Sequence, residues 1–106
     1  MEKFKKEVLP LADLIDYQKD SVVSKEIIKK GTGTVTLFAF DAGQGLSEHT
    51  VPFDAMANIL DGEARIMIGN KPFKVKTGEM IIMPANEPHR VNAEQKFKML
   101  LVLIKK

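Results

Sequence analysis

Apolar and polar residues alternate along most of this chain in short runs separated by turn residues. Ile66 and Ile68 would share one face of a strand, while Arg65 and Met67 would share the other. Residues 34–40 are rich in β-branched and aromatic side chains, which favours a second strand. Many short strands at regular spacing are typical of an all-β sandwich or barrel.

Turn residues divide the rest of the chain into further segments that favour β-strands. Proline falls in the loops between them, where it removes no ladder hydrogen bond. The segment from Pro10 to Ile15 instead predicts a short N-terminal helical turn, because proline suits a first helical position. Residues 41–45 are expected to form a loop. The expected strands cover residues 22–28, 34–40, 55–60, 64–68, 73–76, 80–83, 89–92 and 97–104.

The last expected strand, residues 97–104, is apolar on both faces. Leu100 and Val102 alternate with Leu101 and Leu103. A strand whose outer face met water would carry polar residues there. We therefore expect the N-terminal segment or a partner subunit to cover that face, and the pattern predicts a homodimer.

Composition narrows the class of protein. The 106 residues predict one domain, 1–106, with its core barrel at about residues 21–104. Apolar residues at 44% and charged residues at 28% are ordinary for a globular protein. The net charge of +2 comes with no concentrated basic stripe, so no nucleic-acid partner is predicted. Because cysteine is absent and no apolar run reaches about 20 residues, we expect no disulfide, no membrane partner and a cytoplasmic protein.

The sequence contains two histidines, His49 and His89, and each lies where an expected strand meets a loop. Histidine can bind a metal, transfer a proton or form hydrogen bonds near neutral pH. Taken alone, such a residue is more often structural than chemical. The spacing around the first histidine changes this interpretation: Gly43 and Gly62 flank His49 at the positions of the first motif of the cupin superfamily.

The second motif of the cupins is matched by Gly78, Pro84 and His89. Asn86 stands where that motif has a glycine, and asparagine tolerates the left-handed backbone conformation better than most residues. The resemblance covers roughly residues 35–104. The chain thus resembles small single-domain bacterial cupins of unassigned role, which implies a cupin-type double-stranded β-helix (jelly-roll) barrel.

The resemblance also implies where a metal centre would stand. Metal-binding cupins use three histidines and a glutamate, and the corresponding positions here are His49, Val51, Ala55 and His89. Two of the four side chains cannot coordinate, whereas a transition metal needs about three protein ligands to be held tightly. We expect a degenerate site in which His49 and His89 bind a divalent ion weakly, if at all, and we assign no other cofactor.

Val51 and Ala55 would also make the interior of the barrel more apolar. A mostly apolar cavity with a few polar groups suits a small organic molecule. The expected ligand-binding residues are His49, His89, Val51, Ala55 and Met83. In such a pocket the histidines would serve as hydrogen-bonding anchors or as general acid and base.

Three functions remain open from the sequence. The first is a small cupin that binds a small molecule around His49 and His89. The second is a metal-dependent enzyme of the dioxygenase or isomerase type, with the missing ligands supplied by water or substrate. The third is a sensory or binding module without catalysis. The sequence does not decide between an enzyme and a binding protein.

Overall fold

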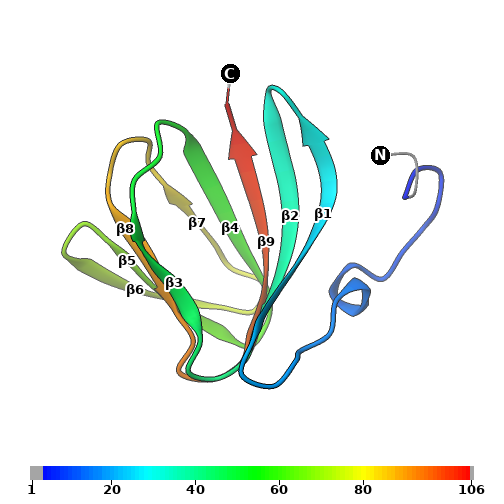
Figure 1. Ribbon diagram of the computed structural model, residues 1–106, viewed down its shortest axis with the longest axis horizontal. Helices are drawn as coiled ribbons and strands as arrows, with labels where there is room; N and C mark the ends of the chain where they lie inside the picture. Colours follow the sequence, from blue (N-terminus) through cyan, green and yellow to red (C-terminus); the bar gives the residue numbers. More distant parts are fainter. Residues whose placement is uncertain (1–3, 106) are drawn as a thin grey trace.

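Two antiparallel β-sheets face each other in the computed structural model, which describes residues 4–105 (Figure 1). Within those residues, no helix is long and apolar enough to span a membrane. The elements in chain order are the 3₁₀ helix η1 (Leu11–Leu14) and the strands β1 (Val22–Lys30), β2 (Gly33–Phe40), β3 (Gly45–His49), β4 (Asp54–Asp61), β5 (Glu63–Ile68), β6 (Lys71–Lys76), β7 (Met80–Met83), β8 (His89–Asn92) and β9 (Phe97–Ile104).

The order of the strands shows how the chain winds. One sheet has five strands in the order β1-β2-β9-β4-β7, and the other has four in the order β3-β8-β5-β6. After β2 the chain passes back and forth between the two sheets, with only the β5–β6 hairpin staying in one of them. This winding is that of a double-stranded β-helix, so the all-β jelly-roll barrel predicted from the sequence is confirmed.

The core lies between the sheets because each strand turns alternate side chains inward. In β4, Ala55, Ala57 and Ile59 are buried at 3% exposure or less. They join a hydrophobic cluster to which both sheets contribute. Within it the rings of Phe40 and Phe97 stack with their centroids 4.5 Å apart. The predicted strand periodicity therefore matches the buried face.

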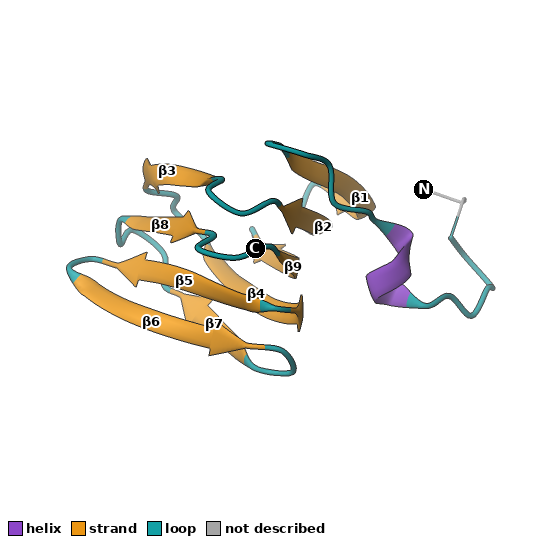
Figure 2. Ribbon diagram, turned by 90° about the horizontal axis from the view of Figure 1, so that it is seen from below, coloured by secondary structure: helices purple, strands orange, loops and turns teal. Residues whose placement is uncertain are grey.

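A smaller core lies on the outer side of the five-stranded sheet. Leu11 and Leu14 of η1, together with Leu100, pack against buried residues that include Leu37. Figure 2 shows η1 beside the five-stranded sheet, on the side away from the four-stranded sheet. The Lys98 ammonium, on the same face, donates a hydrogen bond of 2.7 Å to the carbonyl of Ala12 in η1. The predicted helical turn and the predicted N-terminal cover over residues 97–104 are both confirmed, although the cover reaches only part of the sheet.

One strand was not predicted by the sequence pattern. β3 begins at Gly45, which we expected in a loop, and pairs with β8 at the edge of the four-stranded sheet. Among its residues only Leu46 is half-buried, and the other four are exposed. An edge strand with a single inward apolar side chain gives almost no hydrophobic alternation, which is why the pattern fails there.

Two positions of the motif region adopt backbone conformations that restrict their side chains. Gly62, between β4 and β5, has a φ of +79°, and a Cβ there would lie 2.4 Å from the carbonyl oxygen of Lys96. Asn86 has a φ of +67°, in the left-handed region. The expectation that asparagine takes the place of glycine at this position is confirmed.

The outer edge strand β1 is irregular. Its register against β2 shifts between Glu26 and Ile28, so that the strand contains a β-bulge. Ile27, at the bulge, packs with the N-terminal cluster, whereas Ile28 remains 49% exposed. The bulge thus separates a covered part of β1 from an uncovered part.

Candidate functional site

The two histidines meet across one end of the four-stranded sheet. His49 is the last residue of β3 and His89 the first of β8, and they are directly paired across the two strands. Their ring centroids lie 4.4 Å apart, and the rings meet edge to face at 66°. Residues far apart in the sequence are therefore brought together, as the cupin resemblance implied.

Each imidazole is held in the same way by the backbone two residues before it. Nδ1 of His49 lies 2.8 Å from the carbonyl oxygen of Ser47, and Nδ1 of His89 lies 3.3 Å from that of Glu87. A carbonyl oxygen only accepts hydrogen bonds, so each Nδ1 carries a proton and donates it. In a neutral ring the lone pair is then on Nε2, and each Nε2 is a hydrogen-bond acceptor or metal ligand.

The two rings differ in their surroundings. His89 is buried at 4% exposure, whereas His49 is exposed. Burial lowers the pKa of His89 below its ordinary value of 6.5; the hydrogen bond to Glu87 opposes this shift, and the proximity of His49 adds to it. The pair therefore lies at the rim of the barrel, with a neutral His89 on the inner side and His49 facing solvent.

The other predicted ligand-binding residues lie toward the same end of the barrel. Ala55 and Met83 are directly paired across β4 and β7, and both are buried within the main hydrophobic core. Val51 is half-buried in the connection from β3 to β4, and its carbonyl accepts a hydrogen bond of 2.8 Å from the Asn86 amide. The structure thus packs Ala55 and Met83 into the core at this end, and ties the β3–β4 connection to the loop that precedes β8.

The residues at this end do not fit a tight metal centre. Within residues 4–105, no group of three or more histidine, cysteine, aspartate or glutamate side chains is arranged to hold a metal ion. Asp54 is exposed, and its Oδ1 accepts a hydrogen bond of 2.8 Å from the amide of Ala85. Glu48 is also exposed. The two imidazoles stand without carboxylate companions, and we derive no chemistry through a metal.

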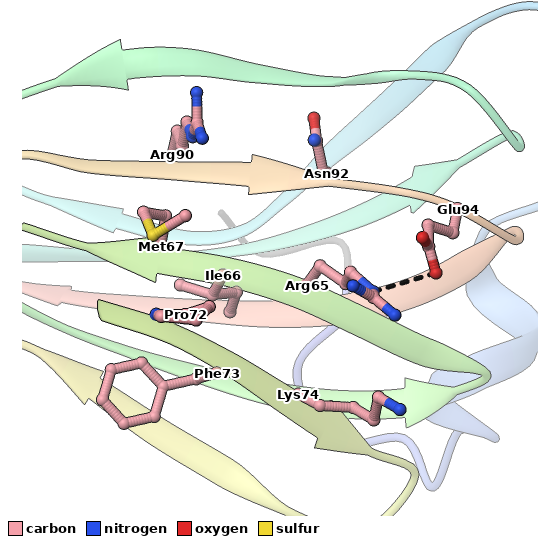
Figure 3. Close-up of a pocket in the computed structure, with 9 residues that line it drawn as sticks. All are labelled: Arg65, Ile66, Met67, Pro72, Phe73, Lys74, Arg90, Asn92 and Glu94. Atoms are coloured by element: carbon pink, nitrogen blue, oxygen red, sulfur yellow. Dashed lines mark ion pairs between the residues drawn. The ribbon is translucent and has the colours of Figure 1, made fainter. Parts of the chain in front are cut away.

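A cavity that the sequence did not predict lies on the outer face of the four-stranded sheet. It has a volume of about 470 Å³ (Figure 3). Arg90 lies here, on the opposite face of β8 from its neighbour His89, because successive residues of a strand point to opposite sides. The sequence pattern predicted that Arg65 and Met67 share one face of a strand. It did not predict the pairing of β5 with β8, which brings Arg90 beside them. The lining residues are Arg65, Ile66, Met67, Pro72, Phe73, Lys74, Arg90, Asn92 and Glu94.

This outer cavity is shallow, and the positive charge of its lining is partly neutralised. Arg65 forms an ion pair of 2.9 Å with Glu94, and both side chains are at least half exposed (Figure 3). An exposed pair of this kind is worth about 0–1 kcal/mol. Because the sheet itself separates the cavity from His49 and His89, the two sites are distinct.

Comparisons with known proteins agree with this fold and with the motif spacing. Residues 36–105 match the family model of the cupin domain. A conserved protein of unknown function from Streptococcus pyogenes superposes with a TM-score of 0.91 at 36% identity, over 95% of this chain and 89% of that one. A cupin superfamily protein from Desulfitobacterium hafniense gives 0.91 at 27% identity, over 96% and 94%.

A third solved structure belongs to a chain that is longer than the part matched here. The cupin 2 conserved barrel domain protein from Leptotrichia buccalis superposes with a TM-score of 0.86 at 43% identity, and the match covers 89% of this chain but 46% of that one. No curated protein matches the chain. With the jelly-roll topology, the motif glycines and the histidine pair in place, the family match shows that this chain belongs to the cupin family.

Proposed function

We propose that the chain binds a small organic molecule at the rim of the barrel, with His49 and His89 as paired hydrogen-bond acceptors. The observation that carries this proposal is that both neighbouring rings are held through Nδ1 by the backbone. Each Nδ1 donates to a backbone carbonyl, and the ring centroids are 4.4 Å apart. Two pre-oriented Nε2 acceptors at one place suit a ligand that offers two neighbouring donors.

The electrostatics of the pair point to a class of ligand. An imidazole binds an anion well only when it is protonated, and burial lowers the pKa of His89 and so opposes protonation. A neutral molecule with hydroxyl or amide N–H donors avoids this cost. We therefore propose a hydroxylated or amide-bearing ligand rather than a carboxylate or phosphate, with its apolar part toward Ala55 and Met83.

The metal alternative has less support. Two imidazoles alone make a weak, exchangeable site for a divalent ion, and the nearby Asp54 side chain is engaged with the Ala85 amide. The proposed function is therefore binding by the protein's own side chains, and it assigns no catalytic step.

The test is histidine-ring NMR on ¹⁵N-labelled protein with two probes of similar size, catechol and benzoate. We expect catechol, which has two adjacent hydroxyl donors, to shift the Nε2 resonances of His49 and His89, and benzoate to leave them unchanged. His49→Ala and His89→Ala should each weaken catechol binding about tenfold or more, since each removes one acceptor. Arg90→Ala is the matched control on the opposite face of β8 and should bind as the parent does.

Other results would overturn the proposal. A benzoate response equal to that of catechol would contradict the preference for neutral donors. Loss of binding in Arg90→Ala, with retention in both histidine variants, would move the site to the outer cavity. Stoichiometric Zn²⁺ binding below about 1 μM that disappears in His49→Ala would favour the metal-dependent alternative.

A further inference from the structure

We propose that the outer cavity of the four-stranded sheet binds a small aromatic carboxylate, with its negative charge on Arg90 and its ring over Met67. The cavity lies on the opposite face of the sheet from His49 and His89, so the inference is independent of the ligand proposed for that pair. Its volume of about 470 Å³ is within the range of about 300–1,000 Å³ that is usual for pockets binding small molecules.

One row of paired side chains forms the floor of the cavity and one of its walls. Met67 of β5 is directly paired with Arg90 of β8 on one side and with Pro72 of β6 on the other. Directly paired residues point to the same side of a sheet, with Cβ atoms about 4.5–5.5 Å apart. Met67 is half-buried, and Pro72 adds a second apolar side chain. The row therefore offers an apolar floor with a guanidinium beside it.

The neighbouring row on the same face is polar. Arg65 of β5 is directly paired with Asn92 of β8 and with Lys74 of β6. This row is two residues along the strands from the first, or about 6.8 Å away. Long side chains therefore surround the apolar floor, and they form the walls of the cavity.

Two other lining residues turn toward the inner face of the sheet. Ile66 and Phe73 are paired with each other, Ile66 is buried in the main core, and Phe73 packs against that core. They alternate along β5 and β6 with Met67 and Pro72, which consequently face outward. The apolar side chains that an outside ligand would contact are thus Met67 and Pro72.

Arg90 is the cation of this lining that has no counter-charge. Arg65 forms an ion pair of 2.9 Å with Glu94, and the Lys74 ammonium lies 3.9 Å from the Glu63 carboxylate. In the part of the chain that the structure describes, no carboxylate forms an ion pair with Arg90, which is exposed. One guanidinium without a partner calls for one negative charge, so the ligand is a monoanion.

The acidic residue of the lining sets the orientation of this ligand. Figure 3 shows Arg90 and Met67 together at one end of the cavity, while Glu94 lies at the other end, against Arg65. An anion at that second end would have to compete with Glu94 for Arg65. The ligand's carboxylate therefore lies on Arg90, at the end away from Glu94.

The chemistry of the floor and wall selects an aromatic carboxylate over a simple anion. A guanidinium presents parallel N–H donors that match the two oxygens of a carboxylate. Asn92 lies two residues from Arg90 on the same face, and its side-chain amide has further donors. A methionine thioether makes favourable contacts with aromatic rings. An aromatic carboxylate combines both groups in one small molecule.

The test is an NMR titration of the ¹⁵N-labelled full chain with benzoate, acetate and inorganic phosphate, each to about 20 mM at constant ionic strength. We expect benzoate to shift the resonances of Met67, Arg90 and Asn92, with a Kd of about 1–10 mM, and to leave those of the His49 and His89 rings unchanged. Acetate and phosphate should bind at least about fivefold more weakly, because neither has a ring to lie on the floor.

Three variants separate the guanidinium from the floor. Arg90→Ala should weaken benzoate binding about tenfold, because it removes the charged donor. Arg90→Lys should restore only part of the affinity, since an ammonium does not match a carboxylate with two parallel bonds. Met67→Gln keeps the length of the side chain but makes the floor polar, so it should weaken benzoate binding about threefold and leave acetate binding unchanged.

The matched control is Lys29→Ala, which removes the same charge from an exposed position on β1 in the other sheet. It should bind benzoate as the parent does. Absence of any benzoate shift at about 20 mM overturns the proposal. Equal weakening in Arg90→Ala and Lys29→Ala reduces the effect to net charge and also overturns it. Acetate or phosphate binding as tight as that of benzoate overturns the assignment of an aromatic ligand.

Discussion

The two ends of the barrel interior differ in what fills them. At one end Phe40, Phe97 and Ile59 have no exposed surface, and the phenylalanine rings stack. At the other end His49 and His89 pair at the rim, and only the inner ring is buried. In Figure 1 the sheets come together at the bottom, where β2 ends and β9 begins, and diverge toward the top, where β3 ends and β8 begins.

Because of this difference, the phenylalanine end serves stability, and the histidine end is the candidate site for recognising a ligand. Large apolar side chains close the phenylalanine end. The histidine end carries two oriented imidazoles beside small or flexible apolar residues, Ala55 and Met83. The phenylalanine end holds the sheets together and thereby fixes the geometry of the histidine end.

The first prediction concerns a large-to-small substitution at the phenylalanine end of the barrel. Phe97→Ala should lower the free energy of unfolding by about 3–5 kcal/mol, because it deletes a fully buried ring stacked on Phe40. Val51→Ala, at a half-buried position near the histidines, should cost less than about 1.5 kcal/mol. Urea denaturation followed by circular dichroism measures both. An equal loss of unfolding free energy in the two variants would contradict the proposed difference between the two ends.

The second prediction concerns the turn at the phenylalanine end. Gly62→Ala should cost about 2–3 kcal/mol, since the residue has a positive φ and the new Cβ would meet the Lys96 carbonyl oxygen at 2.4 Å. Gly69→Ala is the matched control: its φ is also positive, but nothing lies within 4 Å of the Cβ position. It should cost about 1 kcal/mol. Identical melting temperatures would show that the close contact relaxes freely.

The third prediction concerns a new metal-coordinating side chain at the histidine end. Val51→His places a third imidazole at the position where metal-binding cupins have one, and three ligands suffice for zinc. Zn²⁺ affinity, measured by isothermal titration, should rise at least about tenfold over the parent, or about 1.4 kcal/mol. Thr50→His, at the exposed preceding position, should bring little gain. If both variants gain equally, position 51 does not face the histidine pair.

The smallest effect is expected from pH. His89 has a lowered pKa in the folded chain, so the unfolded chain takes up the proton first as the pH falls. The free energy of unfolding should therefore be maintained above pH 6.5, decline below it, and level off once the folded form is protonated as well. His89→Gln should remove this part of the pH dependence, and Arg90→Gln should keep it. Urea midpoints between about pH 5 and 8 provide the measurement.

The sequence predicted most of the fold because its signals are local. Gly62 turns the chain at the expected place, and Asn86 adopts the left-handed conformation that its position in the motif requires. Strand alternation correctly placed Asp54 on the opposite side from Ala55. β3 was missed because a polar edge strand has no such alternation, and it is recognised only by its pairing with β8.

The site could be predicted only in part. The cupin resemblance named His49 and His89, but the carbonyl groups of Ser47 and Glu87 that orient them belong to the backbone and leave no trace in residue type. The outer cavity depends on the pairing of β5 with β8, and Arg90 in isolation looks like any exposed residue of a strand. Residue type indicates a buried or exposed face, whereas only pairing shows which residues from distant segments share it.

The bulge in β1 has a consequence for how this protein avoids aggregation. An open sheet edge is a template on which further chains can add strands and grow into fibres. Here the shift between Glu26 and Ile28 breaks the regular ladder of hydrogen bonds at that edge, and exposed Lys25, Lys29 and Lys30 surround the break with positive charge. Strand addition at β1 is thereby discouraged.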